Sequence, residues 1–366
     1  MDKQIRIWCF GLLVLVLPAC LKANMANPIQ KGTLAATPFV AQHAEILNAQ
    51  IVAQLDSICR QARFTVRYVI WVEEAKPQVP FLFYAADYLE DFQLTLDGEP
   101  QTISPLPASF GQDPGPHFSE VFPADDWDQS LRTYLSFGEG QRYTVAASDY
   151  QFFEADLSAG RHTLTVSYLA NQWTDRRDWV QAFSFRYALA PARQWRHLRK
   201  LTLTWIPGPC LQEWKTNLGP PQQISDQQQS WSYTFAEGED LPWDYWLIKY
   251  QPPISAFAKF LIWLGPTGLA GIAFVVLGLI HNRRLYRRSQ NPTSPAQHGL
   301  VVGALLIPLL ALVTYWKSFV WIDRAIGEAA SGYHGYPFLV VVYLPLIALG
   351  YGVATWALTR WLYPRL

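Results

Sequence analysis

The residues best suited to hold a ligand lie in the segment NQWTDRRDW, at 171–179. Its two tryptophans, Trp173 and Trp179, enclose Arg176, Arg177 and two aspartates. Exposed tryptophan beside arginine and aspartate can stack on a sugar ring, make hydrogen bonds to it, or anchor a protein partner. The alternative is a hairpin end whose tryptophans cover the core while the charges pair in solvent. We take Trp173, Arg176, Arg177 and Trp179 as the candidate partner or ligand contact.

Two further groups with chemical potential lie in one long irregular loop. Asp125, Asp126 and Asp128 are weak candidates for a Ca²⁺ site, because carboxylate oxygens suit that ion but the spacing matches no calcium loop. His117, Ser119 and Asp125 could meet as a Ser-His-Asp trio, as such residues can by chance in a domain of this size. The sequence contains no HExxH, G-x-S-x-G, phosphate-binding loop, GxGxxG or CxxC motif. We therefore expect no metal and no cofactor, and we favour a protein without enzymatic activity.

Cys59 and Cys210 are the cysteines of the predicted exported region once a signal peptide containing Cys20 is removed. An oxidising compartment permits a disulfide between them. It would close a loop of about 150 residues and stabilise the fold by up to about 4–5 kcal/mol in the chain-entropy description. Two buried free thiols are the alternative.

The charge distribution limits the possible partners. The net charge of the whole chain is zero, but residues 27–254 carry 17 basic and 26 acidic residues, a net charge of −9. Residues 255–366 carry 9 basic and 2 acidic residues, a net charge of +7. A domain with a net charge of −9 is poorly suited to DNA or RNA, so we exclude nucleic acid as a partner.

The C-terminal third of the chain contains the membrane signals. Three segments are long and apolar enough to cross a bilayer: 257–280, 299–316 and 338–358. The topology determinants are four arginines just after the first segment: Arg283, Arg284, Arg287 and Arg288. Short positively charged loops stay in the cytoplasm, so the first span ends inside. Residues 27–254 are therefore expected outside and the C-terminus inside.

The N-terminus is typical of an export signal. Lys3 and Arg6 precede the apolar run at 7–17, which is too short to span a bilayer comfortably and is followed by small residues. The tetrapeptide LPAC also resembles a bacterial lipoprotein cleavage site, with Cys20 as the lipidated residue. We favour an ordinary signal peptide over residues 1–26, with lipidation or a retained anchor as alternatives.

Apolar periodicity predicts the elements of the exported region. A helix is predicted over 39–60, because apolar residues recur there at spacings of three and four: Val40, Ala44, Leu47, Ile51 and Leu55. Alternation typical of strands follows in seven segments: 64–72, 92–99, 142–147, 162–170, 183–189, 200–206 and 231–235. Seven strands without a long helix between them predict an antiparallel β-sandwich.

Two stretches, FQLTLDGEP and FFEADLSAGRHTLTVSY, together resemble a pattern of jelly-roll and immunoglobulin-like β-sandwich modules. In that pattern one strand ends in an Asx-Gly turn, and a later strand opens after Leu-x-x-Gly. The matching positions are Leu157, Gly160, His162, Leu164, Val166 and Tyr168. His162 stands where the immunoglobulin-like version has a tyrosine. The resemblance covers about 80 residues and implies a fold, but it implies no function because such folds host many functions.

These predictions arrange the whole chain in order. The predicted segments are a signal peptide (1–26), an N-terminal linker and helix (27–62), an extracytoplasmic β-sandwich (63–250), a linker (251–256), the three spans with a cytoplasmic loop (281–298) and an extracytoplasmic loop (317–337) between them, and a cytoplasmic tail (359–366). The fold class is therefore a mainly β exported domain with an all-α anchor of three transmembrane helices.

We expect a bacterial cytoplasmic (inner) membrane protein whose large domain is periplasmic. The expected function is a non-enzymatic binding or assembly module, in contact with the lipid bilayer and with another envelope or membrane protein. The tryptophan-rich segment 171–179 and the irregular loop 110–130 support this expectation, since loops of that length are often functional. The alternatives are a glycan-binding sensor, a subunit of a membrane transport complex, and an envelope enzyme with an unrecognised site.

Overall fold

The structure is a computed structural model. It describes residues 29–40, 44–89, 92–106, 132–136, 142–146, 149–211, 213–225, 228–289, 296–327, 330–332, 334 and 337–362. The predicted signal peptide, Cys20 and the loop 110–130 lie outside the described residues. The chain divides into two compact units. The β unit contains Ile29–Asp175 and Ala182–Pro252, and the helical unit contains Arg176–Gln181 and Pro253–Leu366.

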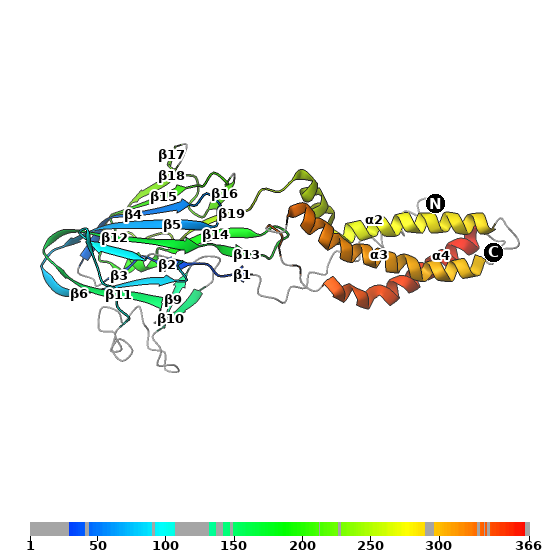
Figure 1. Ribbon diagram of the computed structural model, residues 1–366, viewed down its shortest axis with the longest axis horizontal. Helices are drawn as coiled ribbons and strands as arrows, with labels where there is room; N and C mark the ends of the chain where they lie inside the picture. Colours follow the sequence, from blue (N-terminus) through cyan, green and yellow to red (C-terminus); the bar gives the residue numbers. More distant parts are fainter. Residues whose placement is uncertain are drawn as a thin grey trace. The chain divides into compact units, whose positions relative to one another are not determined.

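The first sheet of the β unit has eight strands, with antiparallel pairing except between β15 and β4 (Figure 1). Its order is β17 (Gln223–Ile224), β18 (Gln229–Thr234), β15 (Lys200–Ile206), β4 (Ala44–Leu55), β5 (Gln61–Val72), β12 (Gly160–Asn171), β7 (Gln93–Leu96) and β8 (Glu99–Pro100). The long strands β4, β5 and β12 form its centre. Their alternating buried and more exposed side chains leave one face apolar, as half-buried strands require.

The second sheet has nine strands and is also largely antiparallel (Figure 1). Its main path is β1 (Ile29–Gln30), β13 (Trp173–Asp175), β14 (Ala182–Ala188), β2 (Leu34–Ala36), β6 (Lys76–Ala86) and β11 (Tyr150–Leu157). Off this path, β19 (Tyr245–Tyr250) pairs with β14 and β16 (Trp214–Thr216), and β3 (Phe39–Val40) pairs with β6. A separate two-stranded sheet contains β9 (Arg132–Ser136) and β10 (Arg142–Ala146).

The two large sheets share one apolar core. Phe64 of β5 lies 6.0 Å, centroid to centroid, from the ring of Tyr187 of β14. The hydroxyls of Tyr68 and Tyr187 form a 2.7 Å hydrogen bond in the same interior. Burial is the main cause that raises the pKa of both phenols, so each stays protonated and one can donate to the other. The core therefore joins the sheets through aromatic packing and one satisfied polar pair.

The helix predicted over residues 39–60 is wrong, because residues 44–55 form strand β4. After a register shift between Ile46 and Asn48, burial alternates with period two, and Ala49, Ile51 and Ala53 are inside. The shift is a β-bulge, which adds one residue to the strand and changes the phase of the pattern. Apolar residues on either side of the bulge are therefore three or four apart, which is the spacing of a helix.

The helical unit confirms three helices that are long and apolar enough to span a membrane. They are α2 (Ala256–Ser289), α3 (Ala296–Ile326) and α4 (Leu344–Leu362), and the short 3₁₀ helix η5 (Pro337–Tyr343) precedes α4. Helix α2 is interrupted at Gly265, whose φ of 64° is left-handed, directly before Pro266. Helix α3 continues ten residues beyond the predicted span, so much of the predicted loop 317–337 is helical.

A polar contact joins the three long helices of this unit. His281 of α2 contacts the carbonyl oxygen of Gly299 at 3.0 Å through Nε2, and the hydroxyl of Tyr351 at 3.0 Å through Nδ1. A Cβ atom at Gly303 would come within 2.0 Å of the His281 ring, so glycine leaves the room that this ring needs. His281 thus connects α2 to α3 and α4.

Candidate functional site

The predicted contact residues Trp173 and Trp179 belong to different units. Trp173 in β13 is only 1% exposed, and its Nε1–H donates to the carbonyl oxygen of Thr33 at 3.1 Å. Trp179 lies in the segment Arg176–Gln181 of the helical unit. Trp173 is therefore not the exposed contact residue that the sequence predicted.

Trp179 packs inside the helical unit. Its ring lies 5.6 Å from Phe319 and 4.3 Å from His334, centroid to centroid. The backbone carbonyl of Trp179 accepts a 2.8 Å hydrogen bond from the N–H of Gly332. His334 in turn contacts the carboxylate of Asp323 at 2.6 Å. This segment is therefore held against the connection between α3 and α4 by rings and by backbone pairing.

The remaining predicted site residues have mixed outcomes. Arg176 is half-buried, and Arg177 is exposed with contacts of its own. Cys59 and Cys210 are joined in a disulfide with a Cα–Cα separation of 6.2 Å. The weak calcium candidates Asp125, Asp126 and Asp128 lie outside the described residues, as do His117 and Ser119. Within the described part of the chain, no group of three or more His, Cys, Asp or Glu residues could hold a metal ion.

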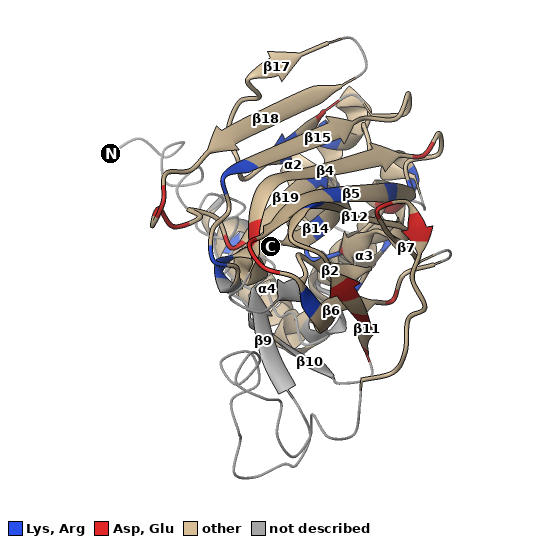
Figure 2. Ribbon diagram, turned by 90° about the vertical axis from the view of Figure 1, so that its left-hand side faces the viewer, with Lys and Arg blue, Asp and Glu red and all other residues tan. Residues whose placement is uncertain are grey.

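Charged side chains are interspersed over the strands of the β unit, and Figure 2 shows basic and acidic segments on neighbouring strands. Arg186 of β14 differs from these charged residues because it is buried. Along β14, Phe185 and Tyr187 point into the core between the large sheets, so Ser184 and Arg186 point to the opposite face. Arg186 is nevertheless only 8% exposed.

The Arg186 guanidinium is held by an aromatic ring and by two long hydrogen bonds. Its Cζ lies 4.3 Å from the centroid of the Trp173 ring, which is a cation–π contact. Its Nε and Nη1 donate to the hydroxyls of Ser184 and Tyr143, both at 3.5 Å. No carboxylate in the described part of the chain forms an ion pair with it. Among the residues that the structure describes, Arg186 is thus a buried cation without a paired carboxylate.

Aromatic side chains cover this face of the nine-stranded sheet. Tyr143 of β10 meets Trp173 edge-on, with centroids 5.4 Å apart. Lys31 lies 5.5 Å from the centroid of the Tyr143 ring. A second apolar cluster surrounds them and includes Leu82, Tyr84, Tyr150 and Phe152. We define Trp173, Arg186 and Tyr143 as the Arg186 site.

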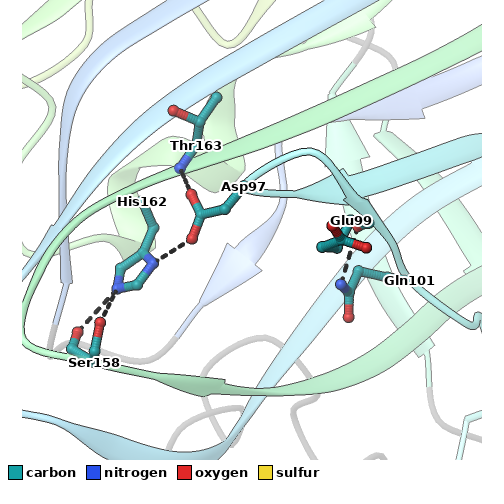
Figure 3. Close-up of polar contacts among 6 residues, drawn as sticks. All are labelled: Asp97, Glu99, Gln101, Ser158, His162 and Thr163. Carbon is teal, nitrogen blue, oxygen red and sulfur yellow. Dashed lines mark hydrogen bonds and ion pairs between the residues drawn. The ribbon is translucent and has the colours of Figure 1, made fainter.

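A second polar cluster lies at two turns at the edge of the eight-stranded sheet (Figure 3). His162 of β12 contacts the carboxylate of Asp97 through Nδ1 at 2.7 Å. Its Nε2 contacts the carbonyl oxygen of Ser158 at 2.9 Å and the Ser158 hydroxyl at 3.4 Å. The other carboxylate oxygen of Asp97 accepts the N–H of Thr163 at 2.7 Å. We call these residues the His162 corner.

The His162 corner contains serine, histidine and aspartate but is arranged to hold turns. A carbonyl oxygen can only accept, so Nε2 carries a proton that it donates to Ser158. Nδ1 faces the carboxylate of Asp97, which accepts a hydrogen bond when ionised, so the protonated ring satisfies both partners. Burial opposes that charge, but the hydrogen bonds to Asp97 and Ser158 and the negative charge of Asp97 outweigh burial and raise the pKa of His162. Nε2 lies closer to the backbone carbonyl of Ser158 than to its hydroxyl, an arrangement that suits a structural contact better than a catalytic base.

The sequence carried weak signals for both clusters. Arg186 is the one charged residue in the otherwise apolar and small strand AFSFRYA, and a charge in a buried strand indicates a role beyond packing. Asp97 and Gly98 form the Asx-Gly turn between β7 and β8, with left-handed φ values of 53° and 88°. Pairing of that turn with His162 depends on contacts 65 residues apart in the chain, which no local pattern encodes.

No known protein family and no curated protein matches the chain. Among solved structures, a Legionella pneumophila protein with the provisional description of a nutrient binding protein has a TM-score of 0.41 and 11% identity, over 76% of this chain and 86% of its own. Yeast LTA4 hydrolase has a TM-score of 0.27 and 8% identity, over 65% of this chain and 35% of its own. An M1 zinc metallopeptidase from Deinococcus radiodurans has a TM-score of 0.24 and 10% identity, over 62% of this chain and 43% of its own. Similarity at this level establishes neither a family nor a function.

Proposed function

We propose that this protein is a non-enzymatic binding module anchored in the bacterial cytoplasmic membrane, with a periplasmic β-sandwich that takes a ligand at the Arg186 site. The three apolar helices support membrane anchoring. The arginine run at the end of α2 supports an inward-facing C-terminal end for that helix. The β unit would then lie on the opposite side of the bilayer from those arginines.

One observation carries the binding role, namely a cation that is only 8% exposed and that forms no ion pair with a carboxylate in the described part of the chain. A buried charge without a partner costs several kcal/mol unless it is compensated. A cation–π contact stabilises by at most about 2 kcal/mol. The two hydrogen bonds of Arg186 are long, at 3.5 Å, and contribute little. A residue that costs stability and yet occupies the centre of a buried face is explained by a ligand that supplies the missing charge or acceptors.

The arrangement of the His162 corner favours binding over hydrolysis. A Ser-His-Asp trio is the constellation that would suggest nucleophilic catalysis. Here both ring nitrogens already donate, and the acceptor of Nε2 is a backbone carbonyl. The trio therefore stabilises two turns of the scaffold on which the Arg186 site is built.

The test compares the full-length protein with Arg186→Met, which replaces the guanidinium by an apolar chain of similar length. Both are purified in a non-ionic detergent and measured by native mass spectrometry and thermal unfolding. We expect a bound small molecule on the wild type that is absent from the variant, and a melting temperature of the delipidated variant equal to or above that of the wild type. Lys200→Gln, an exposed change on the eight-stranded sheet, is the control.

Two results would overturn the proposal. One is a variant whose melting temperature falls by several degrees, which would make Arg186 a stabilising residue of the fold. The other is an unchanged set of bound molecules in wild type, Arg186→Met and Lys200→Gln. The first result would remove the argument from a costly buried charge, and the second would show that no bound molecule depends on Arg186.

A sensor is the second candidate, and the connection between β13 and β14 favours it. These two strands carry Trp173 and Arg186, while the segment that joins them, Arg176–Gln181, belongs to the helical unit. Its Trp179 packs on Phe319 of α3. Ligand occupancy at the strands and the packing of Trp179 would then be linked reciprocally. Trp179→Phe should change ligand affinity in a sensor and leave it unchanged in a passive binding module.

A further inference from the structure

We propose that the Arg186 site recognises a compact oxyanion, a carboxylate or phosphate group, through Arg186 and a neighbouring row that contains Lys249 of β19 and Lys215 of β16. This inference rests on the proposed function, because it names the ligand class of the same site. Three observations carry it: the free edge of the guanidinium, the register of the strands, and the distribution of charge on this face.

The guanidinium of Arg186 has an unused donor edge. Nε and Nη1 make the two long hydrogen bonds, and Nη2 makes none in the described part of the chain. Nη2 is also not among the buried unpaired atoms that are sealed from solvent. An arginine fork binds carboxylate and phosphate through two parallel N–H donors. The adjacent Nη1 and Nη2 form such a pair once a ligand oxygen replaces the 3.5 Å contact from Nη1 to Tyr143.

Strand register places two lysines on the same face. Ser184 of β14 pairs with Lys249 of β19, and Lys249 pairs with Lys215 of β16. Directly paired residues of antiparallel strands point to the same side of a sheet. Trp173 also pairs with Ser184, so the four residues form one row across four strands.

Arg186 lies in the next row, opposite Leu247 of β19. It is a diagonal neighbour of Lys249, and diagonal neighbours are roughly 7–8 Å apart, within reach of two long side chains that share one small ligand. Asp175, the acidic residue of β13, lies on the same face but has contacts of its own. The net charge of the row Trp173, Ser184, Lys249 and Lys215 is +2, and Arg186 beside it adds one more.

The same features limit the ligand to a compact anion. Arg186 is 8% exposed, so a large polyanion cannot surround it. Lys215 is exposed and Lys249 is half-buried, so the exposure of the cations decreases from Lys215 through Lys249 to Arg186. Arg186 lies over the face of the Trp173 ring. A ligand would therefore be recognised by the N–H donors of the guanidinium and not by stacking on that face of the ring. These properties favour charge recognition over sugar stacking, which was one of the alternatives for this segment.

The experiment measures thermal unfolding of the delipidated full-length protein in non-ionic detergent with inorganic phosphate, with citrate, and with sodium chloride at matched ionic strength. A ligand that binds only the folded state raises the melting temperature with its concentration. We expect phosphate or citrate to raise it by several degrees and chloride to have no effect. Arg186→Met should weaken the apparent affinity at least tenfold and Lys249→Gln about threefold, whereas Lys200→Gln should retain it.

A second arm separates a free anion from a lipid headgroup. The protein is reconstituted in bilayer discs of phosphatidylcholine alone or with phosphatidylglycerol. Stabilisation by phosphatidylglycerol that is lost in Arg186→Met would assign the oxyanion to a lipid, and stabilisation only by soluble anions would assign it to a small molecule. Equal stabilisation of wild type and Arg186→Met by every anion, or none in either arm, would overturn the inference.

Failure of this inference remains distinct from failure of the proposed function. A neutral molecule that co-purifies with the wild type and not with Arg186→Met would overturn the oxyanion class while it supports a binding module. No molecule lost from Arg186→Met, together with no anion effect, would overturn both.

Discussion

Two buried basic side chains of the β unit, His162 and Arg186, have opposite surroundings. His162 is 7% exposed and Arg186 is 8% exposed, so both have lost most contact with water. His162 donates to a carboxylate and to a backbone carbonyl at distances below 3 Å. Within the described residues, Arg186 donates only to two hydroxyls at 3.5 Å, and its guanidinium lies against the ring of Trp173. The two side chains are thus buried to a similar degree. The hydrogen bonds of His162 compensate fully for its loss of water, whereas those of Arg186 compensate only in part.

The difference teaches how a buried charge can be assigned to folding or to binding. A buried charge that makes short hydrogen bonds to an oppositely charged group is part of the scaffold. Removal of either partner leaves the other without its hydrogen bond. A charge with spare donors and no counter-ion is not needed for the scaffold, because an apolar residue would fill the same volume at lower cost. Variants at the two cations should therefore separate stability from binding.

The largest expected effect comes from Trp173→Ala, which removes the ring beneath Arg186. Removal of a fully buried tryptophan costs about 3–5 kcal/mol. The carbonyl oxygen of Thr33 also loses the N–H that donates to it. We expect a lower midpoint of chemical unfolding and loss of ligand together. Trp173→Phe keeps a ring under the guanidinium and should lose less of both.

This outcome would differ from that of an exposed contact residue. A tryptophan that anchors a partner from the surface should lose the partner and keep its stability. Unchanged unfolding of Trp173→Ala, measured by circular dichroism in urea, would contradict the buried position of this ring.

The next largest effect is expected at the His162 corner. Asp97→Ala leaves His162 without a carboxylate and the N–H of Thr163 without its acceptor, and the loss of each hydrogen bond costs about 1 kcal/mol. Asp97 also has a left-handed φ of 53° that alanine adopts poorly. Asp97→Asn tolerates that backbone and should retain part of the stability.

The corresponding control is Glu99→Ala in the same hairpin, because that exposed side chain makes no hydrogen bond to the corner in Figure 3. We expect Asp97→Ala to lower the unfolding midpoint while the affinity of the remaining folded protein for the Arg186 ligand stays unchanged. A selective loss of ligand in Asp97→Ala would show that the two clusters are not independent.

The sequence predicted the β-rich region and the three apolar helices because both depend on local periodicity. Strand β12 alternates without interruption over Gly160–Asn171 and was predicted nearly in full. Strand β4 was predicted as a helix because its bulge shifts the phase. Strand β6 lacked a signal because Pro77 and Pro80 precede a continuous apolar run, and prolines weaken a strand assignment. The register of the two large sheets was inaccessible because it depends on non-local pairing.

The candidate site was harder to predict than the fold. Local composition singled out Trp173 and Trp179 together, although the chain carries them into different units. The partners of Trp173 are Tyr143, which is 30 residues earlier in the chain, and Arg186, which follows in the next strand. Burial of a tryptophan cannot be read from its neighbours in sequence, since an exposed and a buried ring occur in the same local pattern.

The dependence of stability on pH is a smaller effect that sharpens the comparison. The pKa of His162 is raised, so its contribution is complete below the unfolded value near 6.5 and declines as the pH rises through the folded pKa. Burial opposes ionisation of Asp97, but hydrogen bonds from His162 and Thr163 lower its pKa. Its contribution is complete above the unfolded value near 4 and declines as the pH falls through the folded pKa. The corner should therefore stabilise most between about pH 4 and 6.5.

The measurement is the urea midpoint of wild type and His162→Gln at pH 5.5, 7.0 and 8.5. Asp97 is half exposed, so solvent screening limits the whole effect to below about 1 kcal/mol. The difference between the two proteins should decrease from pH 5.5 to pH 8.5. A constant difference for His162→Gln would argue against a charged imidazole in the folded state.

The smallest effect on stability is expected at Lys215, the solvated end of the cationic row. Its side chain is exposed on the short strand β16, and surface changes of this kind alter stability by less than about 0.5 kcal/mol. Lys215→Gln should therefore unfold like the wild type. If the row draws an anion toward Arg186, the variant should still bind more weakly at low ionic strength, and the deficit should vanish at high salt because exposed charges are screened.

Lys200→Gln removes one exposed positive charge from the other sheet, so it controls for the change in net charge. An equal loss of anion affinity in both variants would attribute the effect to net charge, and a loss confined to Lys215→Gln would attribute it to the row.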